Sequence, residues 1–424
     1  MLRKHSLAAS FALIAVGVVL MTAVSAWASS TFAVLHNFDN AGYLPVGNLI
    51  FDSKGNIYGT AVRGGLASPN CSWSCGVVFE LSPSGGSWTY KTIYSFSGGT
   101  DGGEPHGRLT VDSKGNLYGT AYVGGTINGN YCPTGCGTAF ELSPAGGGWT
   151  FTLLHGFSGL DGSLPWTGLT TDNAGNLYGT TTMGGNGGGG TVFELSPSGN
   201  GWTFSTLHSL ANSGSEGVFP FSDLVIDGAG NLYGATQQGG SPKSSCGTVF
   251  ELSPSGGSWK FKLLHAFLGA KYGDGGIPWG GLTLDSAGNL YGTTFEGGKS
   301  CNFCGGTVFK MSQSAGKWKE QILHRFSGPD GQGPLGGVTM NKAGNLYGTT
   351  NYGGSSCSDC GTVFKLTLGL NGYWKFTSLY SFAFGTDGAE PYAGVIVDAS
   401  GNLYGATTYG GIFYGGTLFE LSSP

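Results

Sequence analysis

The sequence predicts an all-β protein: a seven-bladed β-propeller of four-stranded blades, closed by its N-terminal strand, which completes the last blade. Three observations predict this fold. The phrase GNLYGT recurs along the chain with small variations, each copy is followed by the same order of apolar segments, and the two ends of the array hold complementary parts of one unit.

The Gly-Asn pair of this phrase occurs seven times, at a spacing of 55–60 residues. The Asn residues are Asn56, Asn116, Asn176, Asn231, Asn289, Asn345 and Asn402. Self-similarity at such a period indicates a repeat architecture. We therefore expect one repeat domain in place of the two or three independent domains that a chain of 424 residues would otherwise suggest.

Each repeat contains four segments with the character of short strands. In the second repeat these are residues 109–112, 116–121, 138–143 and 149–157, each bounded by Gly, Pro or Ser. Four strands per unit are typical of a propeller blade. The repeats are longer than most known blade repeats, and the excess lies in Gly-rich loops.

The two ends of the array predict how the ring closes. Residues 31–38 match the fourth strand of a repeat but have no third strand before them, and residues 416–421 match the third strand but have no fourth after them. We therefore expect the first strand of the chain to complete the last blade. Closure of this kind removes the free sheet edges that would otherwise promote aggregation.

The repeated phrase is best explained as a structural turn. The Asp at position 112 and its counterparts would accept hydrogen bonds in a tight hairpin, and Gly115 would adopt a positive φ. Tyr118 would pack between blades, and the small Gly119-Thr120 pair would let neighbouring sheets approach. A calcium loop is the alternative, but one carboxylate per turn is too few for an ion that takes six to eight oxygen ligands.

Composition and charge exclude some classes of protein. The 83 Gly residues suit turns, and 13% aromatic residues suit strands and argue against disorder. Charged residues make up only 10% of the chain, and the net charge is −5. This balance offers no basic surface for nucleic acid.

The N-terminus is typical of a secretory signal peptide. A basic start at residues 3–5 precedes an apolar run over residues 7–24, and residues 26–28 (Ala-Trp-Ala) have the small-x-small pattern of a cleavage site. We expect residues 1–28 to be removed, the alternative being an uncleaved anchor. Residues 29–424 would then be one exported propeller domain, monomeric and without a membrane span, that is secreted, periplasmic or at the cell surface.

The punctuated segments resemble a known family. The phrase GTVFELSPSG occurs at residues 190–199 and 247–256, and GNLYGTT or a close variant of it precedes the corresponding segment in each repeat. The unit resembles the Gloeo/Verruco (GloVer) tandem repeat of bacterial exported proteins, and its turn is similar to that of NHL-type propellers. The resemblance covers residues 31–424 and implies the architecture and export, but no settled activity.

Nine cysteines lie between the second and third strands of their repeats. Eight form close pairs, Cys71 with Cys75, Cys132 with Cys136, Cys301 with Cys304, and Cys357 with Cys360. In an exported chain such pairs indicate disulfides. Zinc is the alternative, but 52 residues separate the two CxxC pairs, whereas zinc-ribbon pairs lie roughly 15–20 residues apart. Cys246 has no nearby partner and is expected to be a free thiol or an intermolecular link.

Histidine occupies one position of the fourth strand in five repeats. These residues are His36, His155, His208, His265 and His324, and Tyr94 and Tyr380 replace them in two others. A position that accepts either His or Tyr is expected to pack an aromatic ring with a polar tip. We therefore expect neither a metal ion nor a cofactor.

The loop before the first strand carries a DGxxP motif in five repeats, with Glu216…Pro220 as a variant and Asp39…Pro45 as a looser copy, and the residue after the Pro is often aromatic. The ligand-binding candidates are His106, Trp166, Trp279, Tyr392, Asp161, Asp274 and Asp387. Aromatic rings at a concave mouth can stack on sugars, and carboxylates can accept hydrogen bonds from hydroxyl groups. The alternative for Asp and Pro is that they only shape the turn.

Three functions remain open. The first is non-enzymatic binding or adhesion to an extracellular ligand, a polysaccharide or a cell-surface protein. The second is a glycan lyase or hydrolase, for which His106, Glu104 and Arg63 are the candidates because catalysis breaks repeat symmetry. The third is a purely structural ring.

Overall fold

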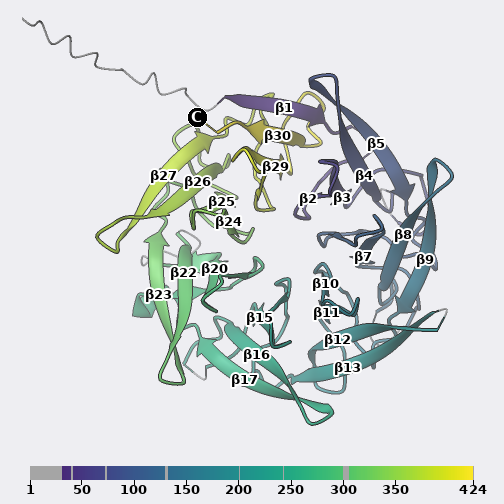
Figure 1. Cartoon of the computed structure of the whole chain (residues 1–424), viewed down its shortest axis with the longest axis horizontal. Coiled ribbons are helices and arrows are strands. Elements are labelled where there is room, and N and C mark those ends of the chain that lie inside the picture. Colours follow the sequence, from purple (N-terminus) through teal and green to yellow (C-terminus); the bar gives the residue numbers. More distant parts are fainter. Residues whose placement is uncertain are drawn as a thin grey trace, which may run out of the picture.

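The computed structural model describes residues 31–39, 42–71, 74–128, 132–199, 201–241, 243–298 and 305–423. Seven four-stranded antiparallel sheets stand around a central axis like the blades of a propeller (Figure 1). The predicted fold is confirmed. The predicted signal peptide, residues 1–28, lies outside the described residues.

The blades follow one another in chain order, and within each the strands run from the channel to the rim. Blade 1 holds β2 (Ile50–Phe51), β3 (Ile57–Ala61), β4 (Val77–Ser84) and β5 (Ser87–Ser95); blade 2 holds β6 (Thr110–Val111), β7 (Leu117–Ala121), β8 (Thr138–Ala145) and β9 (Gly148–Gly156); blade 3 holds β10 (Thr170–Thr171), β11 (Leu177–Thr181), β12 (Gly188–Ser198) and β13 (Gly201–Ala211); blade 4 holds β14 (Val225–Ile226), β15 (Leu232–Thr236), β16 (Thr248–Ser255) and β17 (Ser258–Ala266). Blade 5 holds β19 (Thr283–Leu284), β20 (Leu290–Thr294), β22 (Thr307–Ser314) and β23 (Lys317–Arg325); blade 6 holds β24 (Thr339–Met340), β25 (Leu346–Thr350), β26 (Thr362–Leu368) and β27 (Trp374–Ser381); blade 7 holds β28 (Ile396–Val397), β29 (Leu403–Thr407), β30 (Thr417–Leu421) and β1 (Phe32–Asn37).

The ring is closed by β1, as the ends of the array predict. It pairs antiparallel with β30, from Phe32 opposite Leu421 to Asn37 opposite Thr417. Figure 1 shows this purple strand beside the yellow end of the chain. As the outer strand of blade 7, β1 covers the edge of β30 that would otherwise be open.

One carboxylate holds the turn between the two inner strands of most blades. In blade 3, Asp172 Oδ1 accepts hydrogen bonds from the backbone N–H groups of Ala174 and Asn176. Its Oδ2 accepts from Asn176 Nδ2 at 2.8 Å and from the Tyr178 hydroxyl at 3.1 Å. Gly175 has a φ of 86°, which favours glycine. This is the structural role that the repeated phrase predicts.

Apolar side chains fill the space between neighbouring blades. Tyr118 of blade 2 packs into the cluster around Leu177 and Phe193 of blade 3, and its ring lies 5.8 Å from that of Trp202. Equivalent clusters join the other blades. The core is therefore a series of interfaces between sheets, as in other radial repeats.

The Gly-Thr pair works differently from the expectation. Gly119 faces Phe140 of its own sheet, where an added Cβ would lie 2.7 Å from that ring. The glycine therefore makes room for a cross-strand aromatic ring and not for the neighbouring blade. Thr120 does contact the next blade, because its Oγ1 donates to the Thr167 carbonyl at 2.6 Å.

The innermost segments of neighbouring blades approach very closely. An added Cβ on Gly336 would lie 2.2 Å from the backbone nitrogen of Gly394, which leaves no space for a side chain. Backbone contact at this level narrows the channel and separates its two ends.

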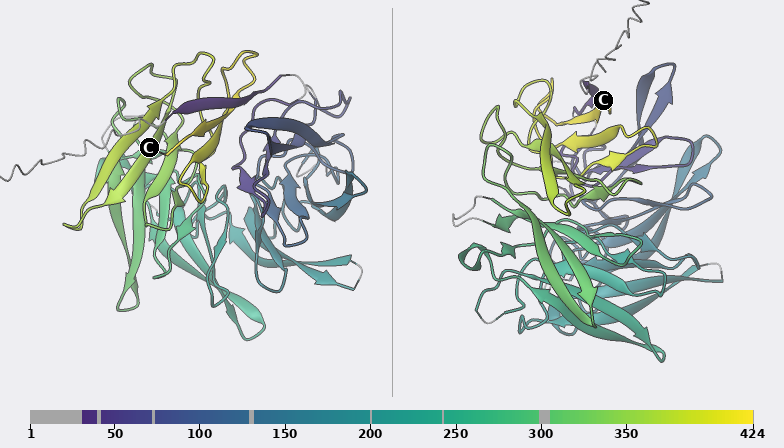
Figure 2. Two further views of the ribbon diagram at one scale, coloured as in Figure 1. Left: turned by 45° about the horizontal axis from the view of Figure 1, so that its top comes forward. Right: turned by 60° about the vertical axis from the view of Figure 1, so that its left-hand side comes forward.

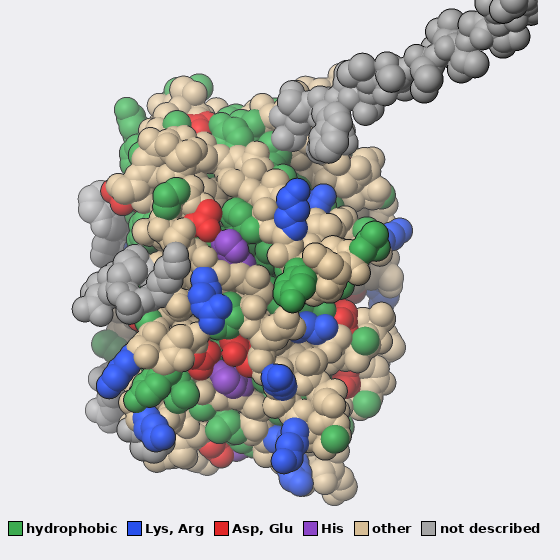
Figure 3. All heavy atoms as spheres, turned by 90° about the vertical axis from the view of Figure 1, so that its left-hand side faces the viewer, with side chains coloured by type: hydrophobic (Ala, Val, Ile, Leu, Met, Phe, Trp, Pro, Cys, Tyr) green, Lys and Arg blue, Asp and Glu red, His purple; other side chains and the backbone are tan. Residues whose placement is uncertain are grey.

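Other elements are small. The described residues include one 3-10 helix, η1 (Ala270–Tyr272), and a two-stranded sheet of β18 (Gly275–Gly276) and β21 (Glu296–Gly297). None of the described helices has the length and apolar character needed to span a bilayer. Figure 2 shows the strands from two further directions, and the face in Figure 3 carries scattered charges of both signs.

Candidate ligand-binding site at the channel mouth

Seven side chains meet at one level of the channel, each from the residue after the Pro of a repeat. They are Val46, His106, Trp166, Phe221, Trp279, Leu335 and Tyr392. His106 stacks on Trp166 with ring centroids 3.7 Å apart, and Trp279 lies 4.8 Å from Phe221 and 6.1 Å from Tyr392. The four predicted aromatic residues are thus in one connected group.

The backbone before each Pro explains why these rings point inward. The residue before the Pro has a left-handed φ, for example 54° at Glu104 and 51° at Glu390. The Glu104 N–H donates to the Cys75 carbonyl of the preceding blade at 2.7 Å, and its carbonyl accepts from Tyr122 of its own blade. Because both backbone groups are held, the strained conformation persists.

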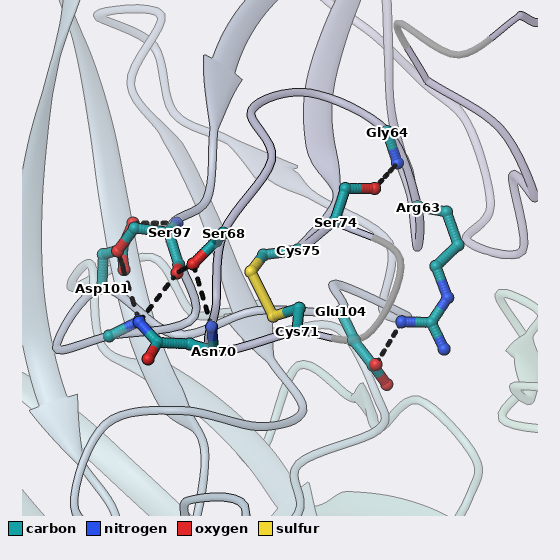
Figure 4. Close-up of a disulfide and its surroundings, with 11 residues drawn as sticks. Arg63, Gly64, Ser68, Asn70, Cys71, Ser74, Cys75, Ser97, Asp101 and Glu104 are labelled. Atoms are coloured by element: carbon teal, nitrogen blue, oxygen red, sulfur yellow. Dashed lines mark hydrogen bonds and ion pairs between the residues drawn. A yellow bond between two sulfur atoms is a disulfide. The ribbon is translucent and has the colours of Figure 1, made fainter.

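The aromatic group forms the floor of a cavity of about 480 Å³. Its lining residues come from blades 1, 2, 3, 5, 6 and 7 and include Arg63, Glu104, Trp166, Trp279, Phe295, Asn351, Tyr352, Glu390, Tyr392, Thr408 and Tyr409. Arg63 and Glu104 form an ion pair across the boundary of blades 1 and 2 (Figure 4). The cavity therefore combines ring faces with a few placed polar groups.

Burial shifts the protonation equilibria of this site. Desolvation, with a smaller contribution from the Arg63 charge, lowers the pKa of His106 to about 3. His106 is therefore neutral at ordinary pH. Burial also raises the pKa of Glu390, and Asp359 adds to this shift.

Two buried polar atoms in this group have no protein partner. His106 Nδ1 and Trp279 Nε1 carry no hydrogen bond. Both side chains also border a smaller cavity of about 50 Å³ at the centre of the channel. Buried polar groups normally find a partner, so these two atoms are available to water or to a ligand.

The three aspartates among the candidates do not line this cavity. Asp161 Oδ2 lies 2.8 Å from His155 Nε2, and Asp387 Oδ2 accepts from the Tyr380 hydroxyl at 3.1 Å. Asp274 accepts from two backbone N–H groups. Each carboxylate turns towards the outer strand of its own blade, which is the turn-shaping role of the alternative interpretation.

The cysteine loops support the cavity from behind. Disulfides join Cys71 to Cys75, Cys132 to Cys136, and Cys357 to Cys360, as predicted. Cys246 is a free thiol, and Cys301 and Cys304 lie outside the described residues. Figure 4 shows the first disulfide between the Asp101 loop and Glu104. Each disulfide therefore stiffens a loop, and a backbone carbonyl of that loop accepts a hydrogen bond from the next blade.

Sequence reasoning missed Tyr352 and Tyr409 as parts of the site. They occupy the same repeat position as Arg63, shortly after the second strand, and all three line the cavity. Met183 holds this position in blade 3 and does not line it. The signal that could have found them is the variation of this position between otherwise similar repeats.

The opposite end of the channel is lined by the inner strands and contains one ion pair. Arg108 Nε lies 3.0 Å from Asp223 Oδ2, and Asp223 Oδ1 accepts from the Gly168 backbone at 2.7 Å. Arg108 also donates to Thr170. The ion pair and these hydrogen bonds link blades 2, 3 and 4, which indicates a structural brace.

These features define a repeat propeller with an aromatic channel mouth, and the comparisons agree at the level of the family. The chain belongs to the Gloeobacter/Verrucomicrobia repeat family, whose pattern matches residues 131–319 and 243–424. Among curated proteins, none matches this sequence.

Several solved structures are similar to this chain. A fungal alcohol oxidase of the AA5 family in complex with copper has a TM-score of 0.57 at 12% identity, covering 93% of this chain and 76% of that chain. A Dyadobacter fermentans protein of unknown function has a TM-score of 0.47 at 11% identity, with coverages of 92% and 96%. A Lactobacillus plantarum protein has a TM-score of 0.48 at 16% identity, with coverages of 80% and 84%. At these identities the likeness concerns the fold alone.

Proposed function

We propose that this protein is an exported propeller that binds an extracellular carbohydrate, without catalysis, at the aromatic channel mouth. The observation that carries the proposal is the cavity of about 480 Å³ with its aromatic floor and polar wall. Small-molecule sites usually measure about 300–1,000 Å³ and combine apolar surface with a few polar groups.

The chemistry of the lining fits a sugar. Ring faces of Trp279, Tyr352 and Tyr409 would stack on the C–H faces of a pyranose, and the unpaired Trp279 Nε1 can donate to a hydroxyl group. The Arg63–Glu104 pair offers both donors and acceptors. Because the polar residues come from only some blades, the site is asymmetric and would bind a ligand in one orientation, unlike a fully symmetric ring.

The first test is a glycan array with the untagged protein of residues 29–424, followed by calorimetry on the glycans that bind. Tyr409→Ala is the informative variant, because Tyr409 is 42% exposed and lines the cavity. Its matched control is Met183→Ala, at the same repeat position, also 42% exposed but outside the cavity. We expect Tyr409→Ala to weaken binding about tenfold, as for the loss of one stacking ring, and Met183→Ala to leave it unchanged.

Equal binding by both variants would move the site elsewhere on the ring. No binding of any glycan by the folded protein would contradict the proposal and favour a protein ligand or a purely structural ring.

A glycan lyase or hydrolase is the second candidate, favoured by one observation. Two carboxylates, Glu104 and Glu390, line the same cavity, and burial raises the pKa of Glu390. A raised pKa suits a general acid. This candidate predicts that wild type releases products from a bound glycan. Loss of this release in Glu390→Gln, with glycan binding retained, would replace the proposal of binding alone with one of catalysis.

A further inference from the structure

The outer strands of the propeller repeat one contact at almost every blade boundary. A His or Tyr near the end of the fourth strand stacks on an aromatic ring in the fourth strand of the next blade. The stacked pairs are His36–Tyr90, Tyr94–Phe151, His155–Phe204, His208–Phe261, His324–Phe376 and Tyr380–Phe32, with ring centroids 3.9–4.9 Å apart.

The boundary between blades 4 and 5 breaks this rule. Glu320 on β23 occupies the position that is aromatic in the other six blades, opposite Met311 as Phe376 is opposite Leu366. His265 of blade 4 therefore faces a carboxylate and not a ring. A glutamate here removes apolar area from the interface, so its presence calls for a compensating interaction.

Three ligand-type side chains converge at this boundary. One nitrogen of His265 and one carboxylate oxygen each of Asp274 and Glu320 all lie within 4.8 Å of one another. The three residues come from β17, from the loop after it, and from β23 of the next blade. Asp274 retains only 9% of its accessible surface, whereas His265 and Glu320 are partly exposed.

The hydrogen bonding of this group is incomplete, in contrast to its counterparts. His155 and His324 lie 2.8 Å from the carboxylates of Asp161 and Asp330. His265 Nε2 lies 3.4 Å from Asp274 Oδ2 and makes no hydrogen bond. Glu320 Oε1 is also buried without a partner. Two buried ligand atoms of this group, His265 Nε2 and Glu320 Oε1, therefore have no hydrogen-bond partner among the described residues.

We propose that His265, Asp274 and Glu320 bind a divalent transition-metal ion of the zinc type that joins blades 4 and 5. An imidazole nitrogen with two carboxylate oxygens is a ligand set that suits zinc and its neighbours, whereas calcium takes oxygen ligands. If the three ligand atoms moved slightly closer together, a metal ion between them would lie about 2.0–2.2 Å from each of them. The expectation from the sequence, that this histidine position only packs, then fails at this one boundary.

The charges around the group fit one cation. Asp274 and Glu320 are the two carboxylates of the group, and Arg325 on β23, whose charge acts on Glu320, donates to the Gly273 carbonyl at 2.8 Å. A bound proton is the competing explanation, because burial, with a contribution from Asp274, raises the pKa of Glu320 to about 7. Figure 3 shows histidines beside acidic side chains on the face that carries β23 and β27.

The test measures zinc binding by the untagged, chelator-treated protein. Wild type is expected to bind one Zn²⁺ per chain by calorimetry and to gain thermal stability with it. Glu320→Phe restores the residue that five of the six other blades carry, so the variant keeps a well-packed boundary. It should lose zinc affinity by on the order of 100-fold or more, since a ligand is removed.

The matched control is Glu216→Gln, because His208 and Glu216 form a similar pair at 3.0 Å without a second carboxylate. This variant should bind zinc as wild type does. The absence of stoichiometric zinc in wild type, or equal affinity in Glu320→Phe, would overturn the proposal. A protein that binds no zinc but becomes more stable as the pH is lowered through neutrality would also overturn the proposal. That result would indicate that a bound proton stabilises this group of side chains.

Discussion

At the scale of the residue, single carboxylates hold the inner turns of the propeller. Asp172 accepts four hydrogen bonds in its turn. Blade 6 has Asn341 at this position, and its side-chain oxygen accepts the two backbone N–H groups at 3.0 Å. The oxygen that accepts from the backbone is therefore the part of the side chain that the turn needs most.

We predict that Asp172→Ala destabilises the protein by about 1–2 kcal/mol, since two backbone donors lose their partner. Asp172→Asn should cost roughly half as much or less, because Asn341 shows that an amide can do the same work. Chemical denaturation followed by fluorescence measures both. Equal stability of the Ala variant and wild type would mean that Gly175 and Asn176 form the turn unaided.

The same turns predict a dependence of stability on acid. Burial alone would raise the pKa of Asp172 and Asp227, but hydrogen bonds from their Asn and Tyr partners outweigh it and lower the pKa below the ordinary 3.8. The unfolded chain then binds protons at higher pH than the folded protein does. This stability is present above about pH 4 and is lost as pH falls further.

Double Asp→Asn substitution at positions 172 and 227 should therefore flatten the loss of melting temperature as the pH falls below about 4. Lys54→Gln, on the exposed turn of blade 1, is the control. An unchanged acid profile would assign acid unfolding to other carboxylates.

At the scale of the element, the loops between second and third strands show why one thiol is free. The carbonyls of Cys75, Cys136, Cys360 and Cys246 all accept a hydrogen bond from the residue before the Pro of the next blade. Cys246 thus holds the second-cysteine position of the pairs, and only its partner is missing. Cys357 lies three residues before Cys360, and Lys243 holds the matching place before Cys246.

We predict that Lys243→Cys forms a disulfide with Cys246. The closed ring is very small, so the gain should be no more than about 1–2 kcal/mol and should disappear under reducing conditions. Mass spectrometry after alkylation and a melting curve with and without reductant measure it. Lys243→Ser is the control, and free thiols at both positions would show that this loop holds its cysteines apart.

The strands themselves were predictable because the same pattern is written seven times. Residues 138–143 were predicted as a strand and lie in β8, and residues 116–121 contain β7. The direction of the aspartates was not predictable, because it depends on pairing with a strand earlier in the same blade. Glu320 was detectable only by aligning the fourth strands, where one carboxylate replaces a ring.

At the scale of the whole molecule, β1 has more neighbours than its own blade. Its Phe32 stacks on Tyr380 of blade 6 at 4.1 Å, and its His36 stacks on Tyr90 of blade 1 at 3.9 Å. Removing this strand exposes the edge of β30 and two aromatic interfaces together. The closure of the ring therefore depends on contacts between three blades and not only on one ladder of hydrogen bonds.

We predict that a chain beginning at residue 40 melts roughly 10 °C or more below the chain beginning at residue 29, because buried aromatic contacts are lost at two boundaries. The shortened chain should also associate through its open edge, which size-exclusion chromatography would detect. A peptide of residues 31–38 should restore both properties, whereas the same peptide with Phe32→Ala and His36→Ala should do so weakly. If the unsubstituted peptide fails to rescue a folded, shortened chain, then the hydrogen-bonded ladder and the stacking rings are not sufficient to hold β1 in place. Closure of the ring would then require that β1 be covalently joined to the rest of the chain.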